Sequence, residues 1–233
     1  MEQMSVRLAE APLIRALPLF EEMSEQSFAD IMGLSMLQRF PARAEIIREG
    51  ELPDFLYVVV EGAIDLYATR DGEETTIDIL YPVSSFILAA VVRDEPHLKS
   101  ARTLVSSQLL MVPSQAVRAT FKRDAAFAHG IAAELAARYR SVTRVLKNDR
   151  MLTSTERLAN WILNTARRSG RNEFELPLEK RKLASYLGMT PESYSRAMTA
   201  LEPYGVHSHG ATITVTDHAR LTEFARPTLI EED

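Results

Sequence analysis

The stretch LASYLGMTPESYSRAMTAL, residues 183–201, decides the fold of the carboxyl-terminal part of the chain, because it reads as two short helices joined by a tight turn. Gly188 interrupts the first helix, and glycine accepts the left-handed conformation in which many helices end. Thr190 is placed to cap the second helix with its hydroxyl, and Pro191 suits the first helical position because no N–H is needed there. We therefore predict a helix–turn–helix.

The second of these helices has two contrasting faces. Apolar residues recur at i, i+3, i+4 and i+7 and form one stripe that we expect to be buried, namely Tyr194, Ala197, Met198 and Leu201. Glu192, Ser195 and Arg196 fall on the opposite face. Their short or hydrogen-bonding side chains suit contacts with base edges in the DNA major groove. An ordinary helical hairpin with a solvated polar face is the alternative.

Two neighbouring segments favour DNA binding. Lys180, Arg181 and Lys182 lie just upstream and could bind phosphates. The segment VHSHGATITV, residues 206–215, reads as a pair of strands around a His-Gly turn, as in the wing of a winged helix. The predicted DNA-binding residues are Lys180, Arg181, Lys182, Thr190, Glu192, Ser193, Ser195, Arg196, His207 and His209.

Length and composition limit the number of domains and the kinds of site that the chain can contain. The 233 residues suffice for one or two domains with their own cores. Without cysteine, the chain can hold no disulfide, thiolate zinc site or cysteine-bound iron–sulfur cluster. No apolar run approaches a membrane span, and the first residues lack the pattern of a signal peptide. We therefore expect a cytoplasmic protein with no membrane partner.

Charge is distributed unevenly along the chain. Residues 1–136 hold 12 basic and 20 acidic residues, net −8, whereas residues 137–233 hold 15 and 12, net +3. An acidic first part and a more basic second part fit a sensor joined to a nucleic-acid binder, although two ordinary globular halves could differ in this way by chance.

The first part of the chain predicts helices followed by a β-roll or barrel. Leu13–Phe40 reads as short helices, and Asp71-Gly72 marks a β-hairpin. The strand-like runs are Ala44–Ile47, Leu56–Val60, Ala63–Thr69, Thr75–Leu80 and Leu104–Val112. Short strands at this spacing are typical of an antiparallel roll or barrel.

The segment IIREGELPDFLYVVVEGAIDLY, residues 46–67, resembles the β-roll of cyclic-nucleotide-binding domains, with Gly50, Tyr57 and Gly62 in the positions of its pattern. Together with the helix–turn–helix, the order of parts resembles the cAMP-receptor/FNR family of bacterial transcription regulators, from about Leu17 to Phe224. The resemblance implies an α+β fold. It would comprise a β-roll sensor domain with N-terminal helices (1–124), a dimerisation helix (125–152) and a winged helix–turn–helix (153–233).

Residues 127–152 read as one long helix with a coiled-coil spacing of four and three residues. The positions that recur are Ile131, Leu135, Arg138, Val142, Val145, Asp149 and Leu152. The family resemblance implies that these positions form the contact between two helices of a dimer, the dimer seam, in which Arg138 and Asp149 could set the register. The alternative is a helix that packs on its own domain. Thr153 and Glu156 offer a capping box for a new helix that ends at Gly170, so we place a hinge between Leu152 and Thr153. Trp161 is expected in the core.

The exposed residues of the second helix indicate which DNA sequence is read. Glu192, Ser195 and Arg196 match the Glu-x-x-Ser-Arg pattern of the FNR-type branch, which implies a TTGAT half-site paired with ATCAA. Arg196 can donate two hydrogen bonds to guanine, and Glu192 can accept one from the amino group of cytosine. The cAMP-receptor branch has arginine where this chain has Pro191, so the half-site should differ from TGTGA.

The sensor pattern departs from cyclic-nucleotide binders. Residues 85–90 lack the glutamate that binds the ribose, and Lys99-Ser100 stands in place of the Arg-Ser pair that binds the phosphate, so we do not expect cAMP. The apolar run 86–92 reads first as β-roll core and alternatively as the lining of a ligand pocket. That pocket would be formed by Phe86, Ile87, Leu88, Lys99, Ser100, Leu135, Arg138 and Val142.

Cysteine-free relatives include haem-dependent sensors of nitric oxide or carbon monoxide. His97 and His129 are the histidines of the sensor half that could ligate haem iron, although a surface or packing role is the alternative for both. We expect His97 in an exposed loop. A redox signal, or no obligatory ligand, remains open.

These patterns predict a homodimeric, DNA-binding transcription regulator whose further partner, by resemblance, is RNA polymerase. The sequence contains no Ser/His/Asp arrangement, HExxH motif or glycine-rich phosphate loop, so we expect no enzyme. The alternatives are a cyclic-nucleotide-binding signalling module without DNA contact and a cAMP-dependent regulator.

Overall fold

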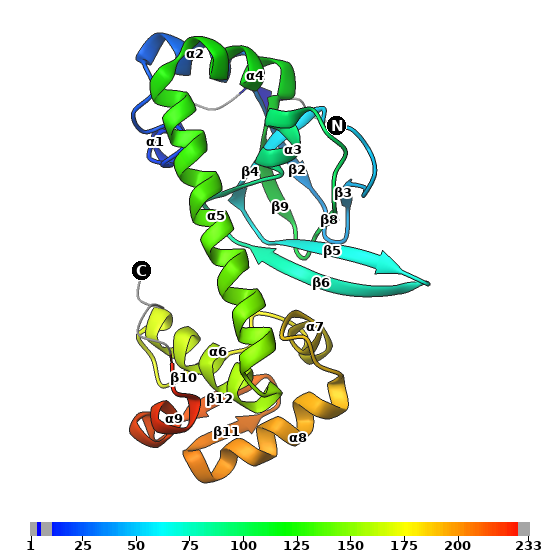
Figure 1. Ribbon diagram of the computed structural model, residues 1–233, viewed down its shortest axis with the longest axis vertical. Coiled ribbons are helices and arrows are strands. Elements are labelled where there is room, and N and C mark those ends of the chain that lie inside the picture. The colour runs from blue at the N-terminus through cyan, green and yellow to red at the C-terminus, as the bar shows by residue number, and fades with distance from the viewer. Residues whose placement is uncertain (1–3, 6–10, 228–233) are drawn as a thin grey trace. The chain divides into compact units, whose positions relative to one another are not determined.

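The computed structural model describes residues 4–5 and 11–227 (Figure 1). The chain divides into two compact units, residues 1–141 and residues 142–233. Helix α5 (Ala125–Met151) runs across the boundary as one continuous helix. Among the described residues, no helix combines the length and the apolar character needed to cross a membrane.

The first unit contains two antiparallel sheets. One has the strand order β1 (Met4–Ser5), β2 (Met36–Phe40), β9 (Ser107–Pro113), β4 (Phe55–Glu61) and β7 (Ser84–Phe86). The other has the order β3 (Glu45–Ile47), β8 (Ser100–Thr103), β5 (Ile64–Arg70) and β6 (Glu73–Leu80). Apolar residues from both sheets form one core, with the stacked rings of Tyr57 and Phe86 in it. The predicted antiparallel roll is thus confirmed.

The β5–β6 hairpin forms where Asp71-Gly72 predicts it. Arg70 pairs with Glu73, so the loop holds two residues, and both have positive φ values of 53° and 83°. This is the conformation that Asp-Gly favours, because glycine has no Cβ and aspartate tolerates the left-handed region.

Among the described residues of the first unit, five helices accompany the sheets. They are α1 (Ala11–Arg15), α2 (Glu25–Leu34), α3 (Leu88–Arg93), α4 (Ser114–Arg123) and the first half of α5. They pack on the first sheet around a second core, which includes Phe20, Leu56, Leu110 and Phe127.

Three expectations for this unit were wrong in detail. Helix was expected to continue to Phe40, but α2 ends at Leu34 and residues 36–40 pair with β9 as a strand. The expected strand 104–112 begins only at Ser107, and a separate strand, β8, precedes it. Helices α3 and α4 were also not predicted; the short apolar run of α3 is compatible with either strand or helix.

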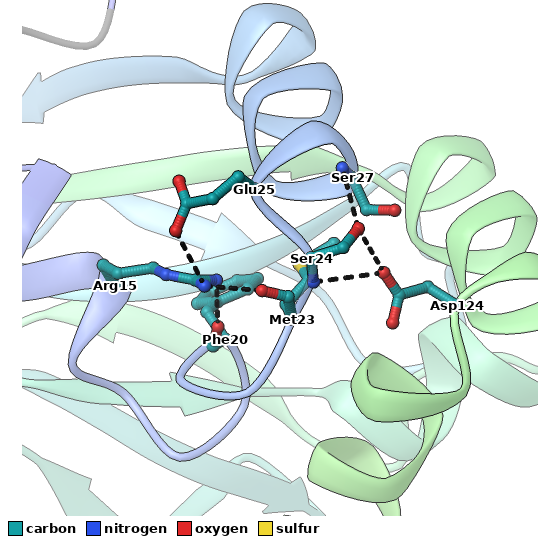
Figure 2. Close-up of polar contacts among 7 residues, drawn as sticks. All are labelled: Arg15, Phe20, Met23, Ser24, Glu25, Ser27 and Asp124. Atoms are coloured by element: carbon teal, nitrogen blue, oxygen red, sulfur yellow. Dashed lines mark hydrogen bonds and ion pairs between the residues drawn. The ribbon is translucent and has the colours of Figure 1, made fainter.

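The turn between α1 and α2 is held by one arginine (Figure 2). The Arg15 guanidinium donates to the carbonyl oxygens of Phe20 and Met23 and also contacts Glu25 at 3.2 Å. The turn is thereby closed onto itself, with the Phe20 ring stacked on Phe127 of α5.

Asp124 joins this turn to the start of α5. Its carboxylate accepts from the Phe127 N–H at 2.9 Å and from the Ser24 hydroxyl at 2.9 Å (Figure 2 shows the Ser24 contact). These hydrogen bonds, the Phe127 N–H first, lower the pKa of Asp124 to about 2. One carboxylate therefore caps α5 and holds Ser24, which itself caps α2.

The second unit contains the last turns of α5 and a small α+β domain. Its elements are α6 (Ser154–Ser169), β10 (Glu173–Glu175), α7 (Lys180–Tyr186), α8 (Pro191–Leu201), a 3₁₀ turn (Glu202–Tyr204), β11 (Val206–His209), β12 (Thr212–Val215) and α9 (His218–Ala225). Helices α6, α7, α8 and α9 enclose a core that is closed on one side by the sheet β10–β12–β11. Trp161 packs against this core, with its ring edge-on to Phe174.

The predicted boundary between α5 and α6 is confirmed at the level of single hydrogen bonds. The Glu156 N–H donates to the Thr153 hydroxyl at 3.3 Å, and the Thr153 N–H donates to the Glu156 carboxylate at 2.8 Å. This reciprocal pair is a capping box. Helix α6 then ends at Gly170, which has a φ of 64°.

Candidate nucleic-acid interface and effector region

Helix α8 presents the two faces that its sequence predicts. Tyr194, Ala197, Met198 and Leu201 are all buried in the core of the second unit. The Thr190 hydroxyl accepts from the Ser193 N–H at 3.2 Å, and Pro191 occupies the first turn. Glu192, Ser195 and Arg196 are exposed. A rigid, capped helix therefore carries these three side chains on its solvent face.

A short chain of hydroxyl groups organises that solvent face. The Thr190 and Ser193 hydroxyl groups are hydrogen-bonded at 3.2 Å, and Arg196 Nη2 donates to Ser193 Oγ at 3.0 Å. Hydrogen bonds from its own backbone N–H and from the Thr190 hydroxyl, together with the Arg196 charge, lower the pKa of Glu192. The face thus combines an ionised acceptor with a guanidinium that a neighbouring serine orients.

The three consecutive cations lie at the start of a helix. Lys180, Arg181 and Lys182 form the first turn of α7, directly before Leu183. Lys180 and Arg181 are exposed, and Lys182 is half-buried. Cations are unfavourable at a helix N-terminus, where the helix dipole is positive. Helix stability therefore does not explain this cluster.

The wing is confirmed as a hairpin, and it has a third strand. His209 pairs with Thr212 across the turn, and His207, Ser208 and His209 are exposed. Strand β10 pairs with β12, which was not predicted, because three residues of alternating pattern are too few to distinguish a strand from a loop.

The effector region differs from the predicted pocket. Phe86 and Leu88 are buried in the two cores of the first unit, and Ile87 packs between them with a φ of 62°. Ser100 is buried and accepts from the Glu49 N–H at 3.0 Å. The buried side chains of the apolar run therefore belong to the cores of the first unit, which is the first of the two interpretations.

A cavity of about 240 Å³ does lie in the first unit, beside α5. Its lining consists of Leu17, Pro18, Leu19, Val83, Ser84, Ser85, Glu134 and Arg138. Of the predicted pocket residues, only Arg138 belongs to this lining. The sequence gives no sign that residues 17–19 line this cavity, because they meet α5 only through tertiary packing. They lie against Gly130 so closely that an added Cβ would be 2.9 Å from the carbonyl oxygens of Pro18 and Leu19.

Arg138 is the centre of a polar cluster on the wall of this cavity. Its guanidinium donates to the Ser85 carbonyl at 3.0 Å and contacts the carboxylates of Glu134 at 3.2 Å and Asp78 at 3.7 Å. Burial lowers the pKa of the nearby Lys99, and Asp78 opposes that shift. Glu134 was missed, although an acidic residue four positions before an arginine is a recognisable helical ion pair.

The two candidate haem ligands lie in different environments. His97 is 4 % exposed, so the expectation of an exposed loop was wrong. Its backbone N–H donates to the Glu51 carbonyl and its carbonyl accepts from the Gly50 N–H, both at 2.9 Å, which folds one loop against the other. Burial lowers the pKa of His97. His129 is exposed and lies 3.8 Å from Glu22. Within the described part of the chain, no three His, Asp or Glu side chains are placed to hold a metal ion.

Four of the expected seam positions on α5 make contacts inside their own unit. Ile131 is 1 % exposed and belongs to the core of the first unit, so it cannot face a partner helix. Leu135 packs against the same core, and Arg138 is held in its polar cluster. In the second unit, Asp149 lies 3.5 Å from Arg157. The exposed apolar side chains of α5 are Tyr139, Val142, Val145, Leu146 and Met151.

Comparison with known proteins adds to this geometry. The cyclic nucleotide-binding domain family matches residues 37–124, and the Crp-like helix-turn-helix domain family matches residues 156–224. The chain belongs to the Crp/Fnr family of transcription regulators. It is 28 % identical over 212 residues to the cyclic AMP receptor protein of Thermus thermophilus, covering 89 % of this chain and 96 % of that protein. It is 23 % identical to the transcriptional activator protein FnrA of Stutzerimonas stutzeri, covering 77 % and 76 %.

Solved structures of this family share the fold. The structure of FixK2 from Bradyrhizobium japonicum aligns with a TM-score of 0.71 at 24 % identity, covering 81 % of this chain and 96 % of that one. The β-roll, the long helix and the helix–turn–helix are therefore the Crp/Fnr architecture.

Proposed function

We propose that this Crp/Fnr regulator binds, as a homodimer, a palindromic operator with TTGAT-like half-sites. The observation that carries the proposal is the exposed face of α8, where Glu192, Ser195 and Arg196 share one side of a capped helix. Arg196 would donate to guanine O6 and N7, and the ionised Glu192 would accept from a cytosine amino group. Each such pair typically discriminates by about 1–3 kcal/mol.

Phosphate contacts would come from the first turn of α7 and from the wing. Lys180 and Arg181 are exposed at a helix N-terminus, where their charges oppose the helix dipole. An approaching phosphate would remove that conflict and would also meet the N–H groups of the first turn. His207 and His209 on the exposed β11 strand would add contacts to the backbone.

The dimer would form along the exposed apolar stripe of α5. Tyr139, Val142 and Leu146 are spaced at i, i+3 and i+7 and are 74 %, 66 % and 52 % exposed. The exposed small residues Ala132 and Ala136 extend the same stripe toward the start of the helix. Two reader helices related by a two-fold axis would then meet half-sites one helical turn apart. This proposed seam keeps Val142 from the predicted positions and leaves out the buried Ile131.

The signal would differ from a cyclic nucleotide. Near the cavity, Arg138 is bound by Glu134 and Asp78, whose carboxylates would repel a phosphate. The residues also do not fit haem at His97, because its ring is buried away from the cavity lining. His129, which is exposed on α5, would then be the candidate haem ligand. On DNA, the dimer would act with RNA polymerase.

The test is a binding titration with fluorescent duplexes at one fixed salt concentration. A TTGAT–ATCAA palindrome is compared with a scrambled duplex, using protein alone, with cAMP, and with ferrous haem with and without nitric oxide. We expect the protein alone to prefer the palindrome. No preference under any condition would refute the assignment of the α8 residues.

Similarity to the Thermus cyclic AMP receptor protein favours one second candidate, a cAMP-dependent regulator. Preference for the palindrome that appears only with cAMP would support it. Binding of cAMP without any DNA affinity would instead support a signalling module.

A further inference from the structure

Arg157 makes an unusual set of contacts in the second unit. Its side chain, 16 % exposed, projects from the first turns of α6. Nη1 donates to the Leu152 carbonyl at 2.9 Å, Nε donates to the Leu187 carbonyl at 3.0 Å, and Nη2 donates to the Gly188 carbonyl at 3.2 Å. One guanidinium therefore binds the backbone at two places that are far apart in sequence.

Both places are helix ends that need donors. Leu152 follows the last residue of α5, and Leu187 is the C-cap of α7. Carbonyl groups at helix C-termini have no partner within the helix and carry the negative end of the helix dipole. A planar guanidinium satisfies several of them at once, which a lysine ammonium on a flexible stem cannot do with the same geometry.

The α5 side of this junction also contributes a side chain. Asp149 lies 3.5 Å from Arg157 Nε. A Cβ added to Gly188 would lie 3.7 Å from both Arg157 Nη2 and Asp149 Oδ1, so the turn of the helix–turn–helix rests directly against this ion pair. Met189 alone separates Gly188 from the Thr190 cap of α8.

We propose that Arg157 is a positioning residue that couples the direction of α5 to the placement of the DNA-reading helix α8. The clamp holds the turn before α8 against the carboxyl end of α5, so a change in the last turns of α5 displaces the start of α8. This inference rests on the proposed function for its consequence at DNA, but the mechanical coupling can be measured without DNA.

The first test uses the absence of cysteine from the natural chain. Cysteines introduced at the exposed positions Arg150 on α5 and Ala200 on α8 accept spin labels, and the distance distribution between them reports how α8 sits on α5. We compare Arg157→Gln and Arg157→Lys with the control Arg168→Gln. Arg168 lies on the same helix and donates within it, to the Asn164 carbonyl at 3.4 Å, so the control removes an equal charge.

Arg157→Gln should broaden or shift the distance distribution, Arg157→Lys should do so less, and Arg168→Gln should leave it unchanged. Emission of Trp161, the only tryptophan, checks that each variant keeps its core. An unchanged distribution in folded Arg157→Gln overturns the proposal. If Arg157→Gln loses the native Trp161 emission, the same distances are measured in Arg157→Lys and Asp149→Asn instead. Unchanged distance distributions in both of these variants also overturn the proposal.

The second test measures DNA affinity of the same variants without labels. Arg157→Gln should weaken binding to the palindrome about tenfold or more, because three charge-assisted hydrogen bonds are lost, while binding to scrambled DNA changes little. Parallel loss on both duplexes would indicate a merely structural role and overturn the proposal. If the wild-type protein shows no preference for the palindrome, the proposed function fails, and the label distances still decide the coupling.

Discussion

Replacing Arg196 by alanine should abolish recognition of the guanine in each half-site. Arg196 is exposed on α8, and Ser193 Oγ holds one of its terminal nitrogens at 3.0 Å. A bidentate arginine–guanine pair contributes about 1–3 kcal/mol, and a dimer makes two such pairs. The loss is therefore about 2–6 kcal/mol, which corresponds to a reduction in affinity of roughly 30-fold to more than 10⁴-fold.

The structure also predicts what this variant leaves intact. Because the Arg196 side chain is exposed and outside the core, Arg196→Ala should change the free energy of unfolding by less than about 0.5 kcal/mol. Arg196→Lys is the matched control, since it keeps the charge but loses the planar fork that contacts O6 and N7 together. Ser193→Ala should have a smaller effect, because it removes only the hydroxyl that orients the guanidinium.

The assay is fluorescence anisotropy at constant salt with two duplexes, the TTGAT–ATCAA palindrome and a version in which adenine replaces the guanine of each half-site. The wild-type protein should distinguish the two duplexes, and Arg196→Ala should lose the part of that preference that comes from guanine, keeping only the part that Glu192 supplies through the paired cytosine. The reasoning is refuted if Arg196→Ala retains the wild-type preference for the guanine-containing duplex while its melting temperature is unchanged.

Four further substitutions test the hinge, the start of α5 and the seam. Thr153→Ala removes the capping box of α6 and should lower the free energy of unfolding of the second unit by about 1 kcal/mol. The melting temperature followed by Trp161 emission should then fall by roughly 4–8 °C, and an unchanged melting temperature would contradict this prediction. Asp124 has its pKa lowered to about 2, so its carboxylate stabilises the fold above the ordinary pKa, near 4, and this contribution disappears as pH falls toward 2. Asp124→Asn should therefore lose stability at neutral pH and titrate less between pH 4 and 2 in acid unfolding, and identical acid curves would count against this role. Leu146→Asp should give folded monomers in sedimentation experiments, whereas Ile131→Asp should unfold the first unit; dimers of Leu146→Asp would place the seam elsewhere.

The second unit was predictable because its signals are local. Gly188, Thr190 and Pro191 each set the conformation of their own backbone, and the capping box at Thr153 uses residues three positions apart. Such signals act within a helical turn and do not depend on the rest of the fold. The strand β10 escaped prediction because it exists only through its pairing with β12, which is distant in sequence.

The first unit shows where periodicity stops being informative. The four-and-three spacing along α5 correctly predicts a long helix, but a helix can carry one stripe toward its own domain and another toward a partner. Ile131 and Leu135 belong to the first kind, since they pack with Phe127 on the sheet. His97 likewise reads as a loop residue from Asp-Glu-Pro before it, and only the hydrogen bonds to Gly50 and Glu51 reveal that the loop is buried.

Arg138 belongs to both the predicted seam and the predicted pocket, and its contacts lie within its own unit. Its guanidinium lines the cavity of the first unit and contacts two carboxylates there. Its contacts with Ser85, Glu134 and Asp78 direct it toward its own β-roll. The phase of the helix then turns Tyr139, Val142 and Leu146 outward, where their exposure is otherwise unexplained. The contacts of Arg138 and the packing of Ile131 and Leu135 thus turn one face of α5 toward its own unit, and the proposed seam lies on the exposed face.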